Sequence, residues 1–189
     1  ENHPRKTGVK GEIHVRGPQV MRGYYKNPEA TARVLRDGWM NTGDLGVMTW
    51  NGCLKIVGRS KETIVLLGGE NVEPVPIENR IQESPLVQAC MVVGQDQKYL
   101  AVLVVPAEEQ FGVSLSELSR SDDAHTRVRA EIKKLVSAEA GFKSFERVVD
   151  ARLLPQPFSV GDELTAKLSV KRHVVQEKYA HLIKDIYRE

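Results

Sequence analysis

Two segments of the chain contain most of the side chains whose types and spacing could do chemistry. The first is TGDLG, residues 42–46, and the second is GRSKETIVLLGGENVEP, residues 58–74. Together they supply a carboxylate in an expected turn, an arginine just past an expected strand, a lysine two residues later and a pair of glycines. Carboxylates accept hydrogen bonds from hydroxyl groups, and an arginine donates them without titrating. The combination indicates a binding site for a ligand with several hydroxyl groups.

Asp44 is the carboxylate of the first segment, and its two oxygens suit the 2′ and 3′ oxygens of a ribose. Considered alone, each candidate has a simpler explanation. A TGD tripeptide is common in ordinary turns, and Arg59 could be a surface arginine at the end of a strand. Lys61 could be a solvated loop lysine. Gly68 and Gly69 could form a plain turn. The functional interpretation therefore depends on the joint spacing of the segments.

A third segment, GEIHVRGPQVMRGYYKNPEAT at residues 11–31, completes the pattern. With it, the chain resembles the adenylate-forming enzymes, and within them the acyl-CoA synthetases, most of all the long-chain fatty acid ligases. The resemblance covers nearly the whole chain. It implies that Asp44 binds the ribose of ATP and that Arg59 helps to hold the nucleotide where two domains meet.

The resemblance also implies roles for the residues that follow. Lys61 occupies the family's hinge position, about which a small C-terminal domain turns between a pose that adenylates the substrate carboxylate and a pose that admits CoA. A flexible polar side chain tolerates such a change in backbone angles. Gly68, Gly69 and Glu70 occupy the loop that lines the pantetheine tunnel in the thioester-forming pose. Glycine there allows the backbone to approach a ligand closely.

The last motif is DELTAKLSVKR, residues 162–172. Long-chain ligases typically carry ELTPTLKLKR here, and the first lysine of that pattern is expected to contact the substrate carboxylate and the α-phosphate. The aligned position in this chain is Ser169. Lys167 or Lys171 could reach the same place, with Lys167 the first choice because it lies in the expected flexible stretch. Equally, both lysines could be solvated charges beside a helix that Ser169 caps.

Composition disfavours several classes of function. Lys and Arg number 27 against 25 Asp and Glu, and no long basic run occurs, so a nucleic acid partner is not expected. The five histidines lack the spacing of metal ligands, and no GxxxxGK[ST] loop is present. The family's phosphate loop, its Mg²⁺-contacting glutamate and its acyl tunnel are expected upstream, so this chain is expected to be a C-terminal fragment that does not catalyse alone.

The 2 cysteines and the absence of a long apolar run bear on the compartment. Cys53 and Cys90 lie in apolar surroundings outside any CxxC pair, which predicts buried thiols in a reducing, cytoplasmic compartment. No apolar run reaches the ~20 residues of a membrane span, and the N-terminus lacks a signal-peptide pattern. Peripheral association with a membrane stays open.

The elements expected from the sequence change character near residues 59–62. Before that point the pattern is rich in hairpins, with Asn51-Gly52 as the strongest turn signal. After it, strands and helices alternate. Strands are expected at 13–15, 45–50, 53–57, 64–67, 86–93, 100–105 and 148–154, and helices at 27–35, 76–82, 121–140 and 170–186. Asn27 is expected to cap the first of these helices. The continuous apolar runs at 86–93 and 100–105 are expected to be buried on both faces of a sheet.

The fold class expected from this pattern is α+β. Residues 1–60 are expected to form the β-rich C-terminal edge of a large N-terminal adenylation domain, and residues 61–189 a small mobile C-terminal domain. The resemblance implies a fatty acid CoA ligase whose substrates are fatty acid, ATP and CoA, with Mg²⁺. The alternatives are an acyl-acyl-carrier-protein synthetase, luciferase-like or peptide-synthetase adenylation chemistry, and a nucleotide-binding module that does not catalyse.

Overall fold

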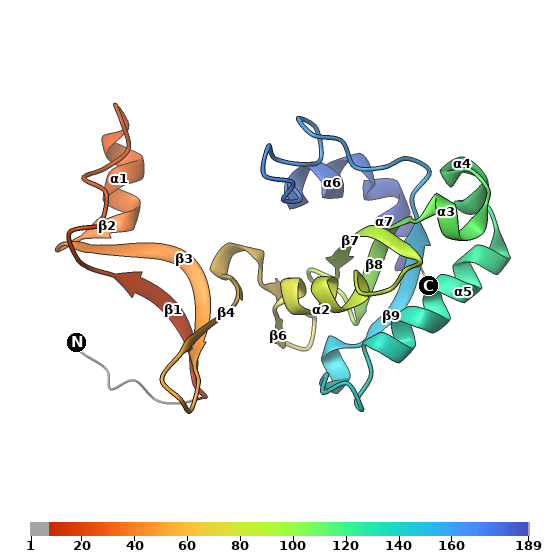
Figure 1. The fold of residues 1–189 in the computed structure, drawn as a ribbon, viewed down its shortest axis with the longest axis horizontal. Coiled ribbons are helices and arrows are strands. Elements are labelled where there is room, and N and C mark those ends of the chain that lie inside the picture. The colour runs from red at the N-terminus through yellow and green to blue at the C-terminus, as the bar shows by residue number, and fades with distance from the viewer. Residues whose placement is uncertain (1–7, 189) are drawn as a thin grey trace. The chain divides into compact units, whose positions relative to one another are not determined.

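The computed structural model describes residues 8–188 (Figure 1). The chain separates into two compact units, residues 1–63 and residues 64–189. The architecture mixes helices and strands, which confirms the α+β prediction, and the two units are described separately below.

The first unit is built on an antiparallel sheet in which β3 pairs with β1, β2 and β4. Asn51 and Gly52 lie in the turn between β3 and β4, as predicted, and Gly52 donates from its amide to the carbonyl of Thr49. Asn27 caps the helix by accepting a hydrogen bond from the amide of Ala30, also as predicted. The elements are β1 (Lys10–Val15), α1 (Pro28–Val34), β2 (Leu35–Arg36), β3 (Trp39–Met48), β4 (Leu54–Arg59) and the 3₁₀ helix η1 (Ser60–Glu62).

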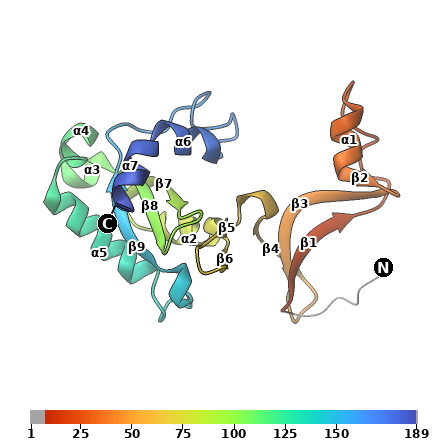
Figure 2. The same cartoon turned by 180° about the vertical axis from the view of Figure 1, so that it is seen from behind.

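The second unit is built on a three-stranded sheet of order β7-β8-β9, in which β7 and β8 are antiparallel and β8 and β9 are parallel. A small β5-β6 pair precedes this sheet. Helices α2 and α5 contact β7 and β9 respectively, and α7 contacts β9 (Figure 2). The strands are β5 (Ile64–Val65), β6 (Asn71–Val72), β7 (Val87–Val93), β8 (Leu100–Pro106) and β9 (Val148–Leu153), and the main helices are α2 (Pro74–Ile81), α5 (Asp122–Leu135), α6 (Arg172–Lys178) and α7 (Ala180–Ile186).

The hydrophobic core of the described chain lies almost entirely in the second unit. All seven residues of β8 are buried, which confirms the prediction that its continuous apolar run is covered on both faces. The same prediction for β7 holds only in part, because Gln88 is exposed and Ala89 is partly buried. In residues 8–63, by contrast, Leu45 is the one buried hydrophobic side chain. The second unit therefore has the core of an independent domain, whereas the first is a sheet with little core of its own.

Several expected boundaries are wrong. Helix α2 begins at Pro74 rather than Pro76, and α5 ends at Leu135, before the expected end at residue 140. The expected final helix is two helices, because the backbone at Tyr179 leaves the helical region between α6 and α7. Two short helices, α3 (Glu108–Phe111) and α4 (Leu115–Leu118), and the 3₁₀ helix η2 (Ser144–Glu146) were not expected.

The prediction of two buried thiols is half correct. Cys90 is buried in the core of the second unit, and burial raises the pKa of its thiol. Cys53 is exposed at the turn between β3 and β4, because the side chains of this hairpin lack a second layer in the described chain. Both cysteines are free thiols.

Candidate functional site

Asp44 and Arg59 face each other across the β3-β4 ladder. Their Cα atoms are paired in the antiparallel register, and Arg59 Nε lies 3.1 Å from Asp44 Oδ1. The Asp44 side chain is 25% exposed and that of Arg59 61% exposed, so both remain accessible to a ligand. The structure thus brings together two residues that the sequence separates by a whole hairpin.

The backbone around Asp44 is held by local hydrogen bonds. The Asp44 amide donates to Thr42 Oγ1 at 3.1 Å, and that hydroxyl donates to the carbonyl of Ile13 on β1 at 2.9 Å. The Gly43 amide donates to Asn41 Oδ1 at 2.7 Å. These residues lie within strand β3, so the expectation that Asp44 sits in a turn is wrong. The strand continues through Gly43, where a positive φ of 73° gives it a local irregularity.

Lys61 lies in η1, three positions before the second unit begins at Ile64. Its side chain is exposed. A 3₁₀ turn is short and weakly bonded, so it is a place where the chain can change direction at small cost.

Gly68, Gly69 and Glu70 form the exposed turn between β5 and β6. The Leu66 amide donates to the carbonyl of Glu70, and the Gly69 amide donates to the carbonyl of Leu66. Gly69 has a φ of +86°, which L-residues rarely adopt, and a Cβ at Gly68 would clash with the Glu70 carboxylate. The turn itself therefore requires glycine at position 69, whatever else the turn does, whereas a side chain at position 68 would require the flexible Glu70 carboxylate to move.

Lys167 lies at the tip of a tight hairpin, residues 164–170, here called the Lys167 hairpin. The Leu168 amide donates to the carbonyl of Thr165, and the Thr165 amide donates to the carbonyl of Ser169, both at 2.9 Å. Leu168 has a left-handed φ of 62°. This is the geometry of a three-residue hairpin loop, and it presents the Lys167 side chain to solvent.

Lys171 is placed differently, at the N-cap of α6. Its Nζ donates to the carbonyl of Gly161 at 2.9 Å, which ties the side chain to the neighbouring loop. The prediction that Ser169 caps this helix is wrong, because the helix begins at Arg172 and Ser169 belongs to the hairpin. Of the two candidate lysines, only Lys167 therefore projects from an exposed tip.

Sequence analysis did not single out the polar residues that support this region. Glu163 is fully buried, and Arg172 Nη1 pairs with Glu78 Oε1 on α2 at 2.6 Å. Arg172 also donates to the carbonyl of Val92 on β7. A faint signal is present, since Glu163 and Arg172 both belong to the DELTAKLSVKR motif, but Glu78 lies 94 positions from Arg172 along the chain.

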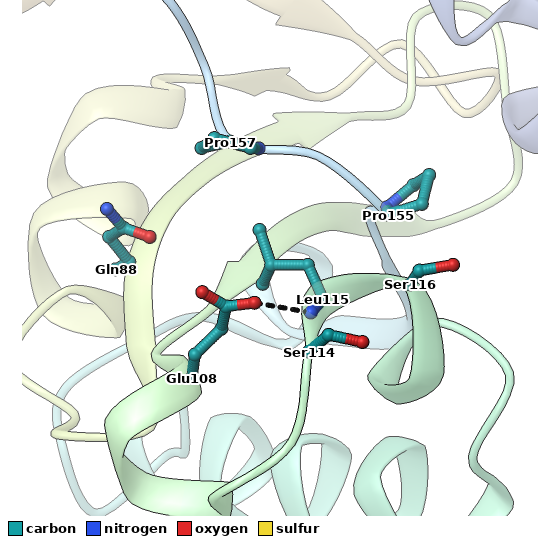
Figure 3. A pocket seen from close by; sticks show the side chains of 7 residues that line it. All are labelled: Gln88, Glu108, Ser114, Leu115, Ser116, Pro155 and Pro157. Carbon is teal, nitrogen blue, oxygen red and sulfur yellow. Dashed lines mark hydrogen bonds between the residues drawn. The ribbon is translucent and has the colours of Figure 1, made fainter.

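A pocket that contains none of the candidate residues lies elsewhere in the second unit (Figure 3). It has a volume of about 340 Å³. Glu108 Oε1 already accepts a hydrogen bond from the Leu115 amide at 2.6 Å, and Ser114 is engaged in a capping box with Glu117. Glu108 and Ser114 therefore serve the fold, and the pocket does not take part in the candidate site.

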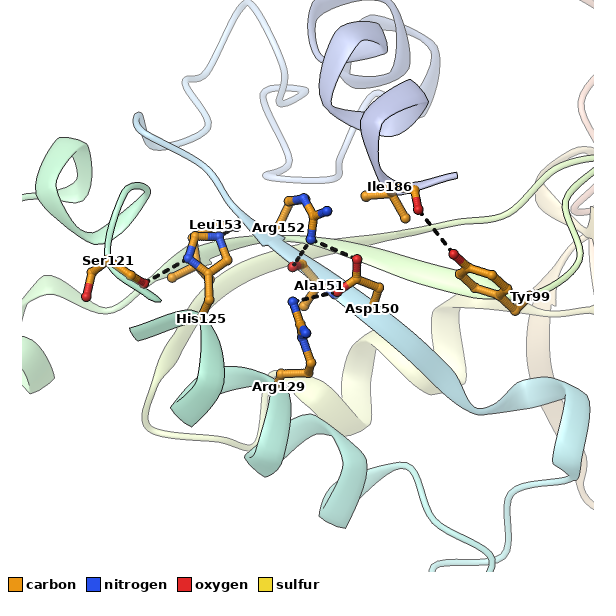
Figure 4. Close-up of polar contacts among 9 residues, drawn as sticks. All are labelled: Tyr99, Ser121, His125, Arg129, Asp150, Ala151, Arg152, Leu153 and Ile186. Carbon is orange, nitrogen blue, oxygen red and sulfur yellow. Dashed lines mark hydrogen bonds and ion pairs between the residues drawn. The ribbon is translucent and has the colours of Figure 1, made fainter. Parts of the chain in front are cut away.

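The partly buried polar contacts beside β9 are structural too (Figure 4). His125 Nδ1 lies 2.9 Å from the carbonyl of Ser121, and its Nε2 accepts from the Leu153 amide at 3.3 Å. Asp150 pairs with Arg129 and with Arg152, each at 2.7 Å. Both ring nitrogens of His125 are therefore engaged in contacts within the fold.

Two kinds of feature are absent from residues 8–188. No group of three or more His, Cys, Asp or Glu side chains there is arranged to hold a metal ion. None of the helices in the same range is long and apolar enough to cross a bilayer.

Comparison with known proteins supplies the wider context. Residues 61–189 match the model of the AMP-binding enzyme C-terminal domain. The chain is 36% identical to the long-chain-fatty-acid–CoA ligase FadD15 of Mycobacterium tuberculosis over 95% of this chain, and 36% identical to the long-chain-fatty-acid–[acyl-carrier-protein] ligase AEE15 of Arabidopsis thaliana over 98% of this chain. It spans 31% and 26% of these two relatives, less than a third of either.

Among solved structures, the chain is similar to the A domain of the carboxylic acid reductase from Segniliparus rugosus, which was solved in complex with AMP and a co-purified carboxylic acid. The TM-score is 0.83 at 27% sequence identity, over 94% of this chain and 28% of that one. The similarity extends through both units, because it covers nearly the whole chain.

Proposed function

The chain belongs to the AMP-binding enzyme C-terminal domain family, and on that basis we propose that it is the C-terminal portion of an ATP-dependent fatty acid CoA ligase. In the first half-reaction, a carboxylate oxygen of the fatty acid attacks the α-phosphorus of ATP, giving acyl-AMP and pyrophosphate. In the second, the sulfur of CoA attacks the acyl carbonyl, and AMP leaves. The observation that carries this proposal is the 36% identity to FadD15 over 95% of the chain.

The Asp44–Arg59 pair is the part of the site that would bind the nucleotide. Asp44 accepts from Arg59 through Oδ1, and a carboxylate has further lone pairs to accept hydrogen bonds from the 2′ and 3′ hydroxyls of ribose. Arg59 both pairs with Asp44 and has other N–H groups to donate to the ligand. The similar reductase domain was solved with AMP, which supports a nucleotide at this pair.

Lys167 is the cation proposed to act at the α-phosphate in place of the family's lysine. Two anions must meet when a carboxylate attacks a phosphate, and a nearby ammonium group lowers the energy of the charge that develops between them. Lys171 is less suited, since its Nζ is bonded to the carbonyl of Gly161. Lys167 lies at the exposed tip of its hairpin and has a long flexible stem.

Lys61 and the β5-β6 turn are proposed to serve the second half-reaction. Lys61 would be the hinge about which the C-terminal domain turns between the adenylating and the thioester-forming poses, and its place beside the unit boundary supports this. Gly68, Gly69 and Glu70 would then line the path of the pantetheine arm of CoA. Mg²⁺ would be bound through residues of the preceding part of the enzyme, where the resemblance to acyl-CoA synthetases implies a glutamate that contacts it.

A second candidate is supported by one observation. The chain is 36% identical to AEE15 over 98% of its length, the same identity as to FadD15. Identity alone therefore supports an acyl-carrier-protein ligase equally. The first half-reaction would be the same, and the thiol acceptor would be a protein-borne pantetheine.

The test is made on the complete ligase polypeptide that carries this chain. Fatty-acid-dependent exchange of pyrophosphate into ATP is expected, followed by acyl-CoA formation when CoA is added. Thioester formation with holo acyl carrier protein alone would select the second candidate. A polypeptide that binds ATP but shows no exchange with any fatty acid would contradict both candidates and indicate a nucleotide-binding module.

A further inference from the structure

The Lys167 hairpin has little packing of its own. Ala166, Lys167, Leu168 and Ser169 are all exposed, and Leu168 is 68% exposed although its side chain is apolar. The hydrogen bonds of residues 165–169 join the two arms of the hairpin to each other. At its base, the Leu164 amide donates to the carbonyl of Ser159 and the Leu164 carbonyl accepts from the amide of Gly161. The direction in which Lys167 points therefore depends on how the base of the hairpin is held.

Glu163 lies at that base and is the most completely buried charged residue in the described chain, at 0% exposure. Its Oε2 accepts hydrogen bonds from both the amide and the hydroxyl of Ser159, each at 3.0 Å. Its Oε1 pairs with Nζ of Lys178 on α6. One carboxylate thus joins the segment before the hairpin to the helix after it.

The backbone of Glu163 also helps to hold the base of the hairpin together. Its carbonyl accepts a hydrogen bond from the Lys171 amide at 2.7 Å, so the residues on either side of the hairpin are bonded to each other. Lys178 Nζ also lies 3.1 Å from Asp162 Oδ2. The base of the hairpin is therefore held by side-chain and backbone bonds that converge on one residue.

A buried carboxylate is a costly way to obtain stability alone. Removing a charge from water carries a desolvation penalty, and an apolar residue of similar size often stabilises as well or better. A buried ion pair that is kept in spite of this cost is well suited to fixing one conformation among several of similar energy. The conformation that Glu163 fixes is that of the loop carrying Lys167.

We infer that Glu163, together with Lys178 and Ser159, is the positioning residue of the adenylation step, which it serves by holding the base of the Lys167 hairpin. This inference rests on the proposed function of Lys167. Glu163 itself touches no substrate. Its effect on the reaction is to keep Lys167 within reach of the α-phosphate when the domain is in the adenylating pose.

The test compares Glu163→Gln and Lys178→Gln with a matched control, Glu177→Gln, which changes an exposed carboxylate on the same helix α6. In the complete ligase, the first two variants are expected to form acyl-AMP about 10- to 100-fold more slowly, since a displacement of about 1 Å can cost on the order of 10²-fold. Transfer to CoA from added acyl-AMP is expected to stay within about twofold of wild type, and Glu177→Gln is expected to match wild type.

Coupling to Lys167 separates positioning from general stability. In a Lys167→Ala background, Glu163→Gln is expected to cause little further loss, because residues that act as a unit are non-additive. A full additional loss would overturn the inference, as would normal acyl-AMP formation by both Glu163→Gln and Lys178→Gln. If Lys167→Ala alone has no effect, the proposed role of Lys167 fails and the inference fails with it.

A second measurement does not depend on activity. It distinguishes failure of the inference on Glu163 from failure of the proposed role of Lys167. Hydrogen exchange in the 189-residue chain is expected to show faster exchange of the Leu168 and Lys171 amides in Glu163→Gln and in Lys178→Gln, with β8 amides unchanged. Equal acceleration across β8 would mean that Glu163 stabilises the whole domain, and the positioning role would be excluded. Faster exchange confined to the hairpin, combined with normal adenylation, would leave the structural link intact but exclude its catalytic role.

Discussion

The first unit holds its candidate pair on adjacent strands, whereas the second unit holds its candidate cation on a loop. Asp44 and Arg59 are placed by the register of β3 and β4, so the backbone ladder alone brings them to 3.1 Å. Lys167 has no such ladder beneath it, and its hairpin is secured by the buried carboxylate of Glu163. Strand pairing can fix a group that binds its ligand in a single position. A group that must approach the ligand and then withdraw is better carried on a loop whose base is held by separate contacts.

The largest loss of adenylation rate is expected on substitution of Lys167, the cation carried on the hairpin. Lys167→Ala in the complete ligase should slow fatty-acid-dependent exchange of pyrophosphate into ATP by roughly 10²–10³-fold, the usual loss when one group that stabilises developing charge is removed. Lys171→Ala should cost much less, because its Nζ serves the Gly161 carbonyl. Lys184→Ala, an exposed lysine on α7, is the control. The reverse ranking of Lys167 and Lys171 would show that the hairpin tip is not the reacting cation.

A smaller loss, in kcat/KM for ATP, is expected on substitution of Asp44 in the Asp44–Arg59 pair. Asp44→Ala should reduce kcat/KM for ATP by roughly 10- to 150-fold, because each lost hydrogen bond to a charged group is worth roughly 1.5–3 kcal/mol. Glu29→Ala, which removes an exposed carboxylate from α1, should leave ATP use unchanged. The measurement is the ATP dependence of acyl-AMP formation. An unchanged value for Asp44→Ala would remove this residue from the ribose site.

The buried carboxylate of Glu163 should also affect how the stability of the chain depends on pH. Burial raises the pKa of Glu163, but hydrogen bonds from Lys178 and Ser159 outweigh that and lower it from 4.5 to about 2. A carboxyl group whose pKa is lower in the folded state stabilises the fold above its unfolded value, and this contribution is lost as the pH falls from 4.5 towards 2. Urea unfolding of the 189-residue chain should therefore show a smaller loss of stability over this range in Glu163→Gln than in wild type. Parallel pH dependences of the two proteins would contradict the shifted pKa.

The smallest change in rate is expected on substitution of Lys61, which lies just before the second unit in the sequence. Proline fixes φ near −65°, which suits a 3₁₀ turn such as η1 but prevents the residue from adopting a second conformation. Lys61→Pro should slow CoA transfer from acyl-AMP while acyl-AMP formation persists, a shift in the ratio of the two rates of about tenfold. Lys61→Ala should change the ratio little. Equal slowing of both half-reactions by proline would argue against a hinge at this residue.

Local signals in the sequence predicted much of the framework. Asn51-Gly52 marked the β3-β4 hairpin, Asn27 marked the start of α1, and the apolar run of β8 indicated a strand buried on both faces. Each of these features depends on residues within a few positions of one another. The resemblance to acyl-CoA synthetases was confirmed by the family match at residues 61–189.

Features that depend on distant partners could not be predicted. Glu163 looks like a solvated residue in a polar motif, and its burial follows from a pairing with Lys178 that has no periodic signal. Asp44 was expected in a turn because Gly43 precedes it, yet pairing with β1 and β4 extends the strand through that glycine. The break at Tyr179 likewise interrupts an apolar pattern that would otherwise describe a single helix.

The claim that the two regions serve different purposes is tested most directly by measuring both half-reactions in Asp44→Ala and Lys167→Ala side by side. Rapid-quench measurements in the complete ligase would follow acyl-AMP formation from ATP, and then acyl-CoA formation from added acyl-AMP. The account predicts that Lys167→Ala slows only the first step at saturating ATP, and that the loss in Asp44→Ala is largely recovered by raising the ATP concentration. Equal slowing of both steps by Lys167→Ala, or a loss in Asp44→Ala that ATP does not relieve, would contradict it.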